Sequence, residues 1–419
     1  MKLRILYRRI IFFICVLQLV IAPFLSYSIF NESNNEVIIF NYFMSVSMSK
    51  YFLIVIPSLL AFYFGLFYKF NFIRKNIKSI NLYKTLQSLK ESKSNFQIGL
   101  LIFLFNVFCF VLARLEIFFH VNISARILES AFLVSLFYFL YSKNILRIFF
   151  IFLNYSFFIF NSIQSGMFGT LFFTTFLILI FYMDIRKISF KKIIFNSILI
   201  IILFLSFQVV KSEYREATFD GINKNSNASL YIDLLIENFK NPELIFNEQT
   251  LFLINVRLNQ GHFLSKVIDH VPKFENYTYG KNILTGFAAA FVPRIIWKNK
   301  PKSGGMNEIT KFANVDYDGS TSINISPIGE AYVCFGLFSA IGLMYLFGLL
   351  INYIWSKFEY KSIYESKILL WLPIFILPIF QAPEENLSSI FNYMIKFAFL
   401  FYVCYITLPK IFFNEKITN

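Results

Sequence analysis

The chain has few charged residues. Only 15% of its 419 residues are Asp, Glu, Lys or Arg, whereas soluble domains carry roughly 25%. Hydrophobic residues make up 57% of the chain, and the mean hydropathy is +0.61. The apolar residues are grouped in blocks of about 17–25, which is the length needed to cross a bilayer. We therefore expect an all-α integral membrane protein and exclude an ordinary soluble enzyme.

Cysteine and glycine-rich motifs are also scarce. The four cysteines (Cys15, Cys109, Cys334 and Cys404) all lie in or beside apolar blocks, so a disulfide framework is not expected. The chain has no glycine-rich loop that could cradle a nucleotide phosphate and no polar cytoplasmic domain. It also lacks the two related halves that many transporters show. These absences argue against a nucleotide-dependent enzyme and against a transporter.

Apolar runs predict about 10 (10–12) transmembrane helices. The ten predicted spans are Ile10–Phe30, Tyr51–Tyr68, Gln97–Ala113, Ile127–Tyr141, Leu146–Ile163, Phe168–Met183, Ile193–Val210, Ile328–Trp355, Ile368–Gln381 and Ser389–Leu408. They divide the chain into an N-terminal bundle (1–210, seven spans), a large loop (211–327) and a C-terminal group (328–419, three spans).

The basic residues predict how this layout is oriented. The two termini and the alternate connections on the same side as them carry 22 Lys and Arg, while the short connections on the other side carry 3. Basic residues concentrate in short cytoplasmic segments. Both termini are therefore predicted to be cytoplasmic, with the large loop on the opposite, external side of the membrane.

One apolar stretch in the large loop is too short to span. Residues 283–296 number about fourteen, and Pro293 would break a helix there. A span at this point would reverse everything downstream and place the basic segment Ser356–Lys367 outside. We therefore expect a re-entrant or interface-lying segment, which is tolerated where it lines a cavity.

A cluster of cations follows this stretch. Arg294, Trp297, Lys298 and Lys300 lie in the run PRIIWKNKPKSGG, which extends from Pro293 to Gly305. Arg offers a fork of donors that matches phosphate oxygens, whereas Lys acts as a point charge. At the outer membrane surface such a group suits a lipid-linked diphosphate. The alternative is a basic anchor for ordinary anionic lipids.

The same region resembles the Wzy-type O-antigen and oligosaccharide repeat-unit polymerases. The features that carry the resemblance are Pro293-Arg294, Trp297, Lys300-Pro301, the Arg-x10-Gly spacing from Arg294 to Gly305, and Gly329-Glu330-x-Tyr332 followed by Gly336. About 60 residues match in this way, and the number of spans and the loop placement agree over the whole chain. An earlier external loop lacks a second Arg-x10-Gly. An Arg at the exit of the seventh span, here Arg215, is similar to the family as well; it could also be an interfacial side chain.

Further candidates lie outside the cation cluster. Arg257 and His262 belong to one predicted helix, Glu248–His270, and would converge only if that helix bends at Gly261. His262 is the best-placed general base, because its unperturbed pKa lies near neutrality. The alternative is that His262 is a solvated helix residue. Two further residues, Glu330 and Lys396, fall inside predicted spans. Glu330 could act as the base, and Lys396 could pair with Glu330 or contact a lipid phosphate.

A metal site is not expected. Asp316 and Asp318 form an Asp-x-Asp pattern, but the following Gly319 makes a turn the simpler interpretation, and no third ligand accompanies them.

The resemblance implies a glycosyltransferase with a GT-C-like architecture that needs no cofactor. It implies transfer of a growing glycan from undecaprenyl diphosphate to a lipid-linked repeat unit of an O-antigen, capsule or exopolysaccharide. In that setting Arg294, Arg257 and Arg215 stabilise the leaving diphosphate, and Trp297, Lys298, Lys300 and Lys396 bind it. The expected partners are the lipid-linked oligosaccharides, membrane lipids, and a flippase and chain-length regulator of the same pathway, with no nucleic acid. An O-antigen ligase or a lipid-linked oligosaccharide flippase is the alternative.

Overall fold

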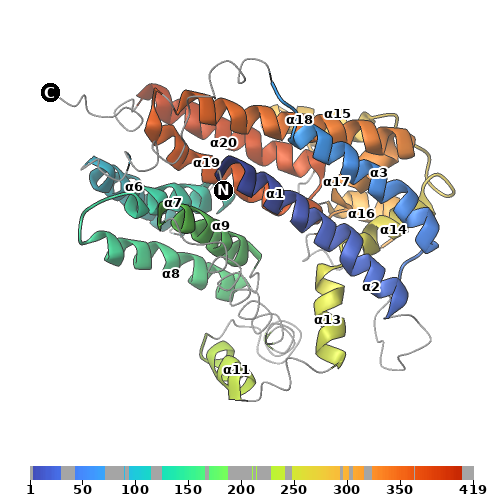
Figure 1. The fold of residues 1–419 in the computed structure, drawn as a ribbon, viewed down its shortest axis with the longest axis horizontal. Helices are drawn as coiled ribbons and strands as arrows, with labels where there is room; N and C mark the ends of the chain where they lie inside the picture. Colours follow the sequence, from blue (N-terminus) through green and yellow to red (C-terminus); the bar gives the residue numbers. More distant parts are fainter. Residues whose placement is uncertain are drawn as a thin grey trace.

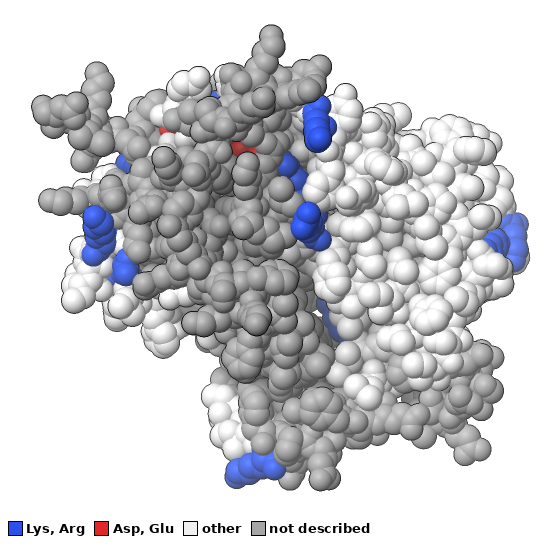
Figure 2. All heavy atoms as spheres, in the orientation of Figure 1, with Lys and Arg blue, Asp and Glu red and all other residues white. Residues whose placement is uncertain are grey.

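The computed structural model describes residues 3–29, 43–70, 89, 94–114, 125–165, 169–186, 210, 214, 228–240, 248–292, 296–301, 305–315, 323–362 and 364–407. Helices and turns make up this described part, without a β-strand. Figure 1 shows α1, α3, α18 and α20 running roughly along the long axis of the molecule, while α13 stands across that direction beneath α2. Much of the described surface in the view of Figure 2 is uncharged, with isolated Lys and Arg side chains.

Five helical segments are long and apolar enough to cross a membrane: Tyr7–Ser28, Met48–Leu66, Ser94–Val111, Leu337–Lys361 and Leu387–Thr407. They belong to α1 (Leu3–Val16) with η1 (Leu17–Ile21) and α2 (Ala22–Ser28), to α3 (Met48–Leu66), to α6 (Ser94–Arg114), to α18 (Leu337–Lys361) and to α20 (Leu387–Thr407). Their outward side chains are large and apolar; Phe338 of α18, for example, is 83% exposed. Such a surface suits lipid, so the prediction of a helical membrane protein is supported.

Shorter apolar helices occupy most of the other predicted spans. They are α7 (Ala125–Leu140), α8 (Arg147–Ser165), α9 (Gly169–Arg186), and η3 (Ser366–Trp371) continuing into α19 (Leu372–Phe380). The predicted span Ile193–Val210 lies outside the described residues, except for Val210. The count of about ten spans therefore stays a prediction.

The predicted span Ile328–Trp355 is wrong as a single helix. The structure divides it into α17 (Ser326–Phe335) and α18 at Gly336, whose φ of 74° and ψ of −141° are accessible essentially only to glycine. A Cβ at this position would lie 2.9 Å from the Tyr277 hydroxyl. The break ends α17 before the long apolar helix begins.

The large loop contributes short helices that pack on the bundle. They are α11 (Ala228–Lys240), α13 (Glu248–Leu258), α14 (Gly261–His270), α15 (Lys281–Phe291) and α16 (Met306–Ala313). The predicted bend at Gly261 is a true break, because α13 ends at Leu258 and α14 begins at Gly261. Two asparagine side chains attach the C-terminal end of α13 to α2. The side-chain amides of Asn255, in α13, and of Asn259, directly after it, each donate to the Ser26 hydroxyl at 2.7 Å.

Helices α3 and α18 approach each other at backbone distance. A Cβ on Gly65 would lie 2.3 Å from the Tyr345 carbonyl oxygen, and one on Gly348 would lie 2.5 Å from the Phe62 carbonyl oxygen. Small residues at such crossings allow membrane helices to pack closely. The Asn352 amide continues the contact by donating to the Gly65 and Tyr68 carbonyl oxygens at 3.2 and 2.7 Å.

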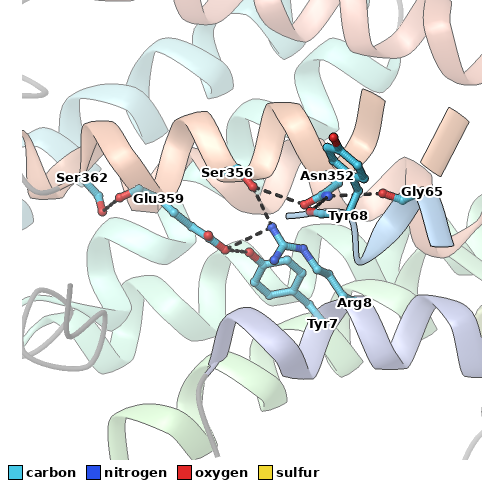
Figure 3. A network of polar contacts seen from close by, with 8 residues as sticks. All are labelled: Tyr7, Arg8, Gly65, Tyr68, Asn352, Ser356, Glu359 and Ser362. Carbon is cyan, nitrogen blue, oxygen red and sulfur yellow. Dashed lines mark hydrogen bonds and ion pairs between the residues drawn. The ribbon is translucent and has the colours of Figure 1, made fainter. Parts of the chain in front are cut away.

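A buried ion pair extends this contact to the N-terminal helix (Figure 3). Arg8 Nη2 lies 3.6 Å from Glu359 Oε1 and donates to the Ser356 hydroxyl at 3.1 Å. The Tyr7 hydroxyl donates to the same Glu359 oxygen. The network thus joins the start of α1 to the end of α18 and, through Asn352, to the end of α3.

Breaking this ion pair should destabilise the protein. Glu359→Gln leaves the Arg8 cation buried without its countercharge, which typically costs about 3–5 kcal/mol. Asp269→Asn is the matched control, because its partner Lys273 is 55% exposed and such pairs contribute at most about 1 kcal/mol. Thermal unfolding in detergent should show a lower midpoint for Glu359→Gln alone. Equal midpoints for the two variants would contradict this expectation.

Candidate functional site

The start of α20 is a meeting point for polar side chains from four segments. Asn386, directly before α20, donates to Glu308 Oε2 of α16, and its Oδ1 accepts from the Ile325 amide at 2.9 Å. Asn324 donates to Glu385 Oε2 at 3.1 Å. These contacts fix α16 and the start of α17 on the first turn of α20.

Glu330 caps α20. Its Oε2 accepts from the Ser388 backbone N–H at 3.0 Å, and its Oε1 accepts from the Ser388 hydroxyl. The first N–H groups of a helix lack partners within the helix, and a carboxylate there also interacts favourably with the helix dipole. Glu330 is 0% exposed. An acceptor sugar therefore cannot reach the predicted base Glu330 unless this turn moves.

A second carboxyl accompanies Glu330. Burial and the neighbouring Glu330 carboxylate raise the pKa of Glu308 to about 8. Burial also raises the pKa of Glu330, but hydrogen bonds from Ser388 and Leu387 oppose that shift. With a pKa of about 8, Glu308 holds a proton at neutral pH. Glu308 is only partly buried, so it can exchange that proton.

This pair makes stability depend on pH. The pKa of Glu308 in the folded protein, about 8, lies above the value near 4.3 expected in an unfolded chain. The stability gained from the bound proton is therefore fully present below about pH 4 and is lost as pH rises through 8. Between pH 6 and 9 we expect the wild-type unfolding midpoint to fall and that of Glu308→Gln to change less. Parallel curves would show that Glu308 binds no proton in this range.

The described parts of the region around the predicted re-entrant segment, α15 and residues 296–301, form a hairpin against α20. Gly286 of α15 packs on Ser388 so closely that a Cβ would lie 2.3 Å from the Ser388 hydroxyl, and the Phe287 ring lies 4.3 Å from the Phe391 ring. Helix α15 therefore runs beside α20 in the same direction, over about 16 Å for eleven residues. That is roughly half the thickness of a bilayer core.

The chain then returns to the start of α20. Lys300 lies beside the end of α15, where its ammonium donates to the Val292 carbonyl oxygen at 3.0 Å. Gly305 ends the return with a φ of 72°, and a Cβ there would lie 2.2 Å from Asn324 Oδ1. The glycine of the Arg-x10-Gly spacing thus meets a backbone and packing requirement at the foot of the hairpin.

Two lysines, Lys300 of the hairpin and Lys396 of α20, lie within electrostatic range of each other. The positive charges of Lys300 and of Lys396 on α20 are close enough to repel each other, and both side chains are only partly exposed. In the described part of the chain, Lys396 forms no ion pair with Glu330 or with any other carboxylate. The predicted Lys396–Glu330 pair is therefore wrong. The structure instead brings Lys396 to the predicted diphosphate-binding residue Lys300.

Arg257 contacts the short segment that directly precedes α20. Its Nη2 is 2.7 Å from Glu384 Oε2, and its side chain is 34% exposed. Glu384 ends the turn η4 (Ala382–Glu384), which leads into α20. Arg257 is therefore anchored by a carboxylate and still reaches the surface.

The His262 side chain contacts a different part of the chain from Arg257. Its Nδ1 lies 3.0 Å from the Phe43 carbonyl oxygen, and the residue is 3% exposed. Burial, with a smaller contribution from the nearby Lys266 charge, lowers the pKa of His262 to about 4. The break between α13 and α14 thus sends Arg257 and His262 to different partners. The role of His262 as a base stays a prediction, and its burial does not favour it.

The remaining candidates are only partly described. Trp297 is partly buried and Lys298 is exposed on the returning arm of the hairpin. Arg215, Arg294 and the Asp316–Gly319 turn lie outside the described residues. No group of three or more His, Cys, Asp or Glu side chains arranged to hold a metal ion occurs among the described residues.

Sequence reasoning missed Glu308, Glu384 and Asn386. Glu384 and Asn386 belong to the short segment Pro383–Ser388, whose polar residues directly precede an apolar helix. That position was the available signal, since a carboxylate or amide at a helix start often caps it. Their partners are up to 366 residues away in the chain, so only the fold reveals the cluster.

Comparisons with known proteins place the chain in a family without assigning a function. Residues 5–419 match the family described as "Domain of unknown function (DUF8712)", and the chain belongs to that family. No curated protein and no solved structure matches the chain.

Proposed function

We propose that this DUF8712 member is a polymerase of lipid-linked oligosaccharide repeat units. In this proposal it has about ten spans in a GT-C-like arrangement and works at the outer face of a bacterial inner membrane. The observations that carry the proposal are the packing of α15 on α20, the contact of Lys300 with the end of α15, and the position of Lys396 on α20 within electrostatic range of Lys300. Two like charges in a partly buried setting are costly. A diphosphate headgroup between them would offset that cost.

The hairpin supports a lipid-linked substrate in particular. Helix α15 lies along the first turns of α20, one of the candidate membrane spans. Lys396 lies nine residues, or about 14 Å, into α20, so a headgroup held there would be within the depth of the membrane, close to its own polyprenyl chain. This geometry is less suited to a diphosphate that arrives free in solution.

The proposed chemistry requires stabilisation of charge and removal of one proton. A hydroxyl oxygen of the acceptor repeat unit attacks the anomeric carbon of the growing glycan. The bond from that carbon to the diphosphate oxygen breaks, and its electron pair leaves with undecaprenyl diphosphate. Lys300, Lys396, Arg257 and the predicted Arg294 stabilise the developing charge. The hydroxyl proton passes to the deprotonated form of Glu308, which we select over the enclosed Glu330; because the pKa of Glu308 is about 8, this group must first release its own proton to solvent.

Deletion of the gene in its native cell tests this function. Loss of a polymerase should leave single repeat units attached to the cell surface on a gel of surface glycans. Long chains stranded on the lipid carrier would indicate a ligase instead. Unpolymerised units held on the cytoplasmic face would indicate a flippase. Either of the last two results would overturn the proposal.

A further inference from the structure

The first membrane helix contains an irregular turn with an identifiable cause. Residues Leu17–Ile21 form a π-helical turn, in which the Ala22 N–H donates to the Leu17 carbonyl. The next residue, Pro23, has no N–H to offer the Leu19 carbonyl four residues earlier. The Tyr51 hydroxyl of α3 occupies that carbonyl instead, at 2.9 Å. The turn is therefore built into the sequence and braced by a neighbouring helix.

This turn presents Gln18 to the candidate site. Gln18 is 4% exposed, and its Nε2 donates to Glu384 Oε1 at 3.0 Å. The other oxygen of the same carboxylate accepts from Arg257 Nη2 at 2.7 Å. One carboxylate thus joins the first span to the large loop, with each of its oxygens bound by a different partner.

The arrangement orients a guanidinium. A carboxylate held at one oxygen by a buried amide has little freedom to rotate, so its second oxygen defines where Arg257 sits. Gly169, at the start of α9, lies on the other side, where a Cβ would be 3.9 Å from Arg257 Nη2. A buried polar side chain in a membrane span is costly and is usually retained for a function. π-helical turns are likewise frequent at functional sites.

We propose that Gln18 and Glu384 are positioning residues, which hold the Arg257 guanidinium toward the substrate diphosphate. This proposal rests on the proposed function for the identity of the anion. Neither residue is assigned contact with the reacting atoms. Gln18 acts on Arg257 only through Glu384, so the three residues should behave as one unit.

Chemical labelling tests the positioning without relying on enzymatic activity. The purified protein in nanodiscs is treated with phenylglyoxal, and modification of Arg257 is followed by mass spectrometry. Gln18→Leu and Glu384→Gln should each increase the labelling rate several-fold, because the guanidinium is released. Asn106→Leu is the control. It replaces another buried amide in a candidate span, one whose Nδ2 has no hydrogen-bond partner among the described residues.

Polymerisation of a defined lipid-linked repeat unit provides the second readout. Each variant should raise the donor KM about tenfold or more, the effect expected for a lost hydrogen bond to a charged group, with a smaller change in kcat. The double variant Gln18→Leu/Glu384→Gln should be no worse than Glu384→Gln alone, because both changes act through one carboxylate. Asn106→Leu should leave KM unchanged.

The two readouts separate this proposal from the proposed function. Unchanged Arg257 labelling in Gln18→Leu would overturn the positioning role, as would additive effects in the double variant. Faster labelling in a protein whose wild type forms no polymer would support the positioning role and remove only the diphosphate function.

Discussion

Lys396→Met should stop chain elongation while the protein still inserts into the membrane. The substitution keeps the length of the side chain but removes the charge that lies within electrostatic range of Lys300. Removing one preorganised group that stabilises transition-state charge typically lowers kcat about 100-fold or more. The measurement is glycan chain length on a gel, together with turnover of a lipid-linked repeat unit by the purified protein.

Two companion variants make this result specific to the site. Lys396→Arg retains the positive charge and should restore part of the activity. Lys273→Met removes a cation of the large loop, but this lysine is paired with Asp269 and is 55% exposed. It should therefore support normal elongation. Normal chain length in Lys396→Met would remove this lysine from the substrate site and withdraw the main support for the proposed function.

Gly261→Leu should displace the start of α14 and destabilise the protein. A Cβ at this position would lie 2.1 Å from the Tyr51 hydroxyl and 2.5 Å from Pro23 Cγ, and a leucine extends further into both. The start of α14 would have to leave the π-helical turn on which it rests. Overpacking typically costs about 1–3 kcal/mol, and this position combines it with the loss of the Tyr51–Leu19 hydrogen bond.

Thermal unfolding and proteolysis of the large loop would measure this effect. Gly342→Leu is the matched control, because a Cβ on Gly342 of α18 would meet nothing within 4 Å. We expect a lower unfolding midpoint and faster cleavage near α14 for Gly261→Leu, and wild-type behaviour for Gly342→Leu. If both variants unfold like the wild type, the contact between α14 and the first span is not as close as the structure indicates.

Much of the secondary structure was predictable, because apolar length and proline position act locally. The predicted span Tyr51–Tyr68 corresponds to α3, and the predicted span Gln97–Ala113 lies within α6. The division at Gly336 was missed, since the residues on both sides are equally apolar. What separates α17 from α18 is a backbone conformation and the nearby Tyr277 hydroxyl, and neither alters the hydropathy of the segment.

The candidate site was predictable only as a list of residue types. The cations of the large loop were evident from their sequence, and Lys396 was conspicuous as a charge within a predicted span. Of the two partners considered for Lys396, the Glu330 pair is wrong, because Glu330 accepts from Ser388, and the lipid phosphate stays a prediction. Gln18 gave a weak signal as an amide in an apolar run, but its partner Glu384 is 366 residues away.

By itself the sequence determined that the chain is helical and apolar enough for a membrane, and that its polar residues are concentrated in one long segment. These properties depend on composition and on spacing along the chain. Only the tertiary structure decided which polar groups meet: the carboxyl pair at the start of α20, the two neighbouring lysines and the anchored Arg257. These contacts depend on how segments that are distant in the sequence pack together. They are stabilised by tertiary interactions, which no local sequence pattern specifies.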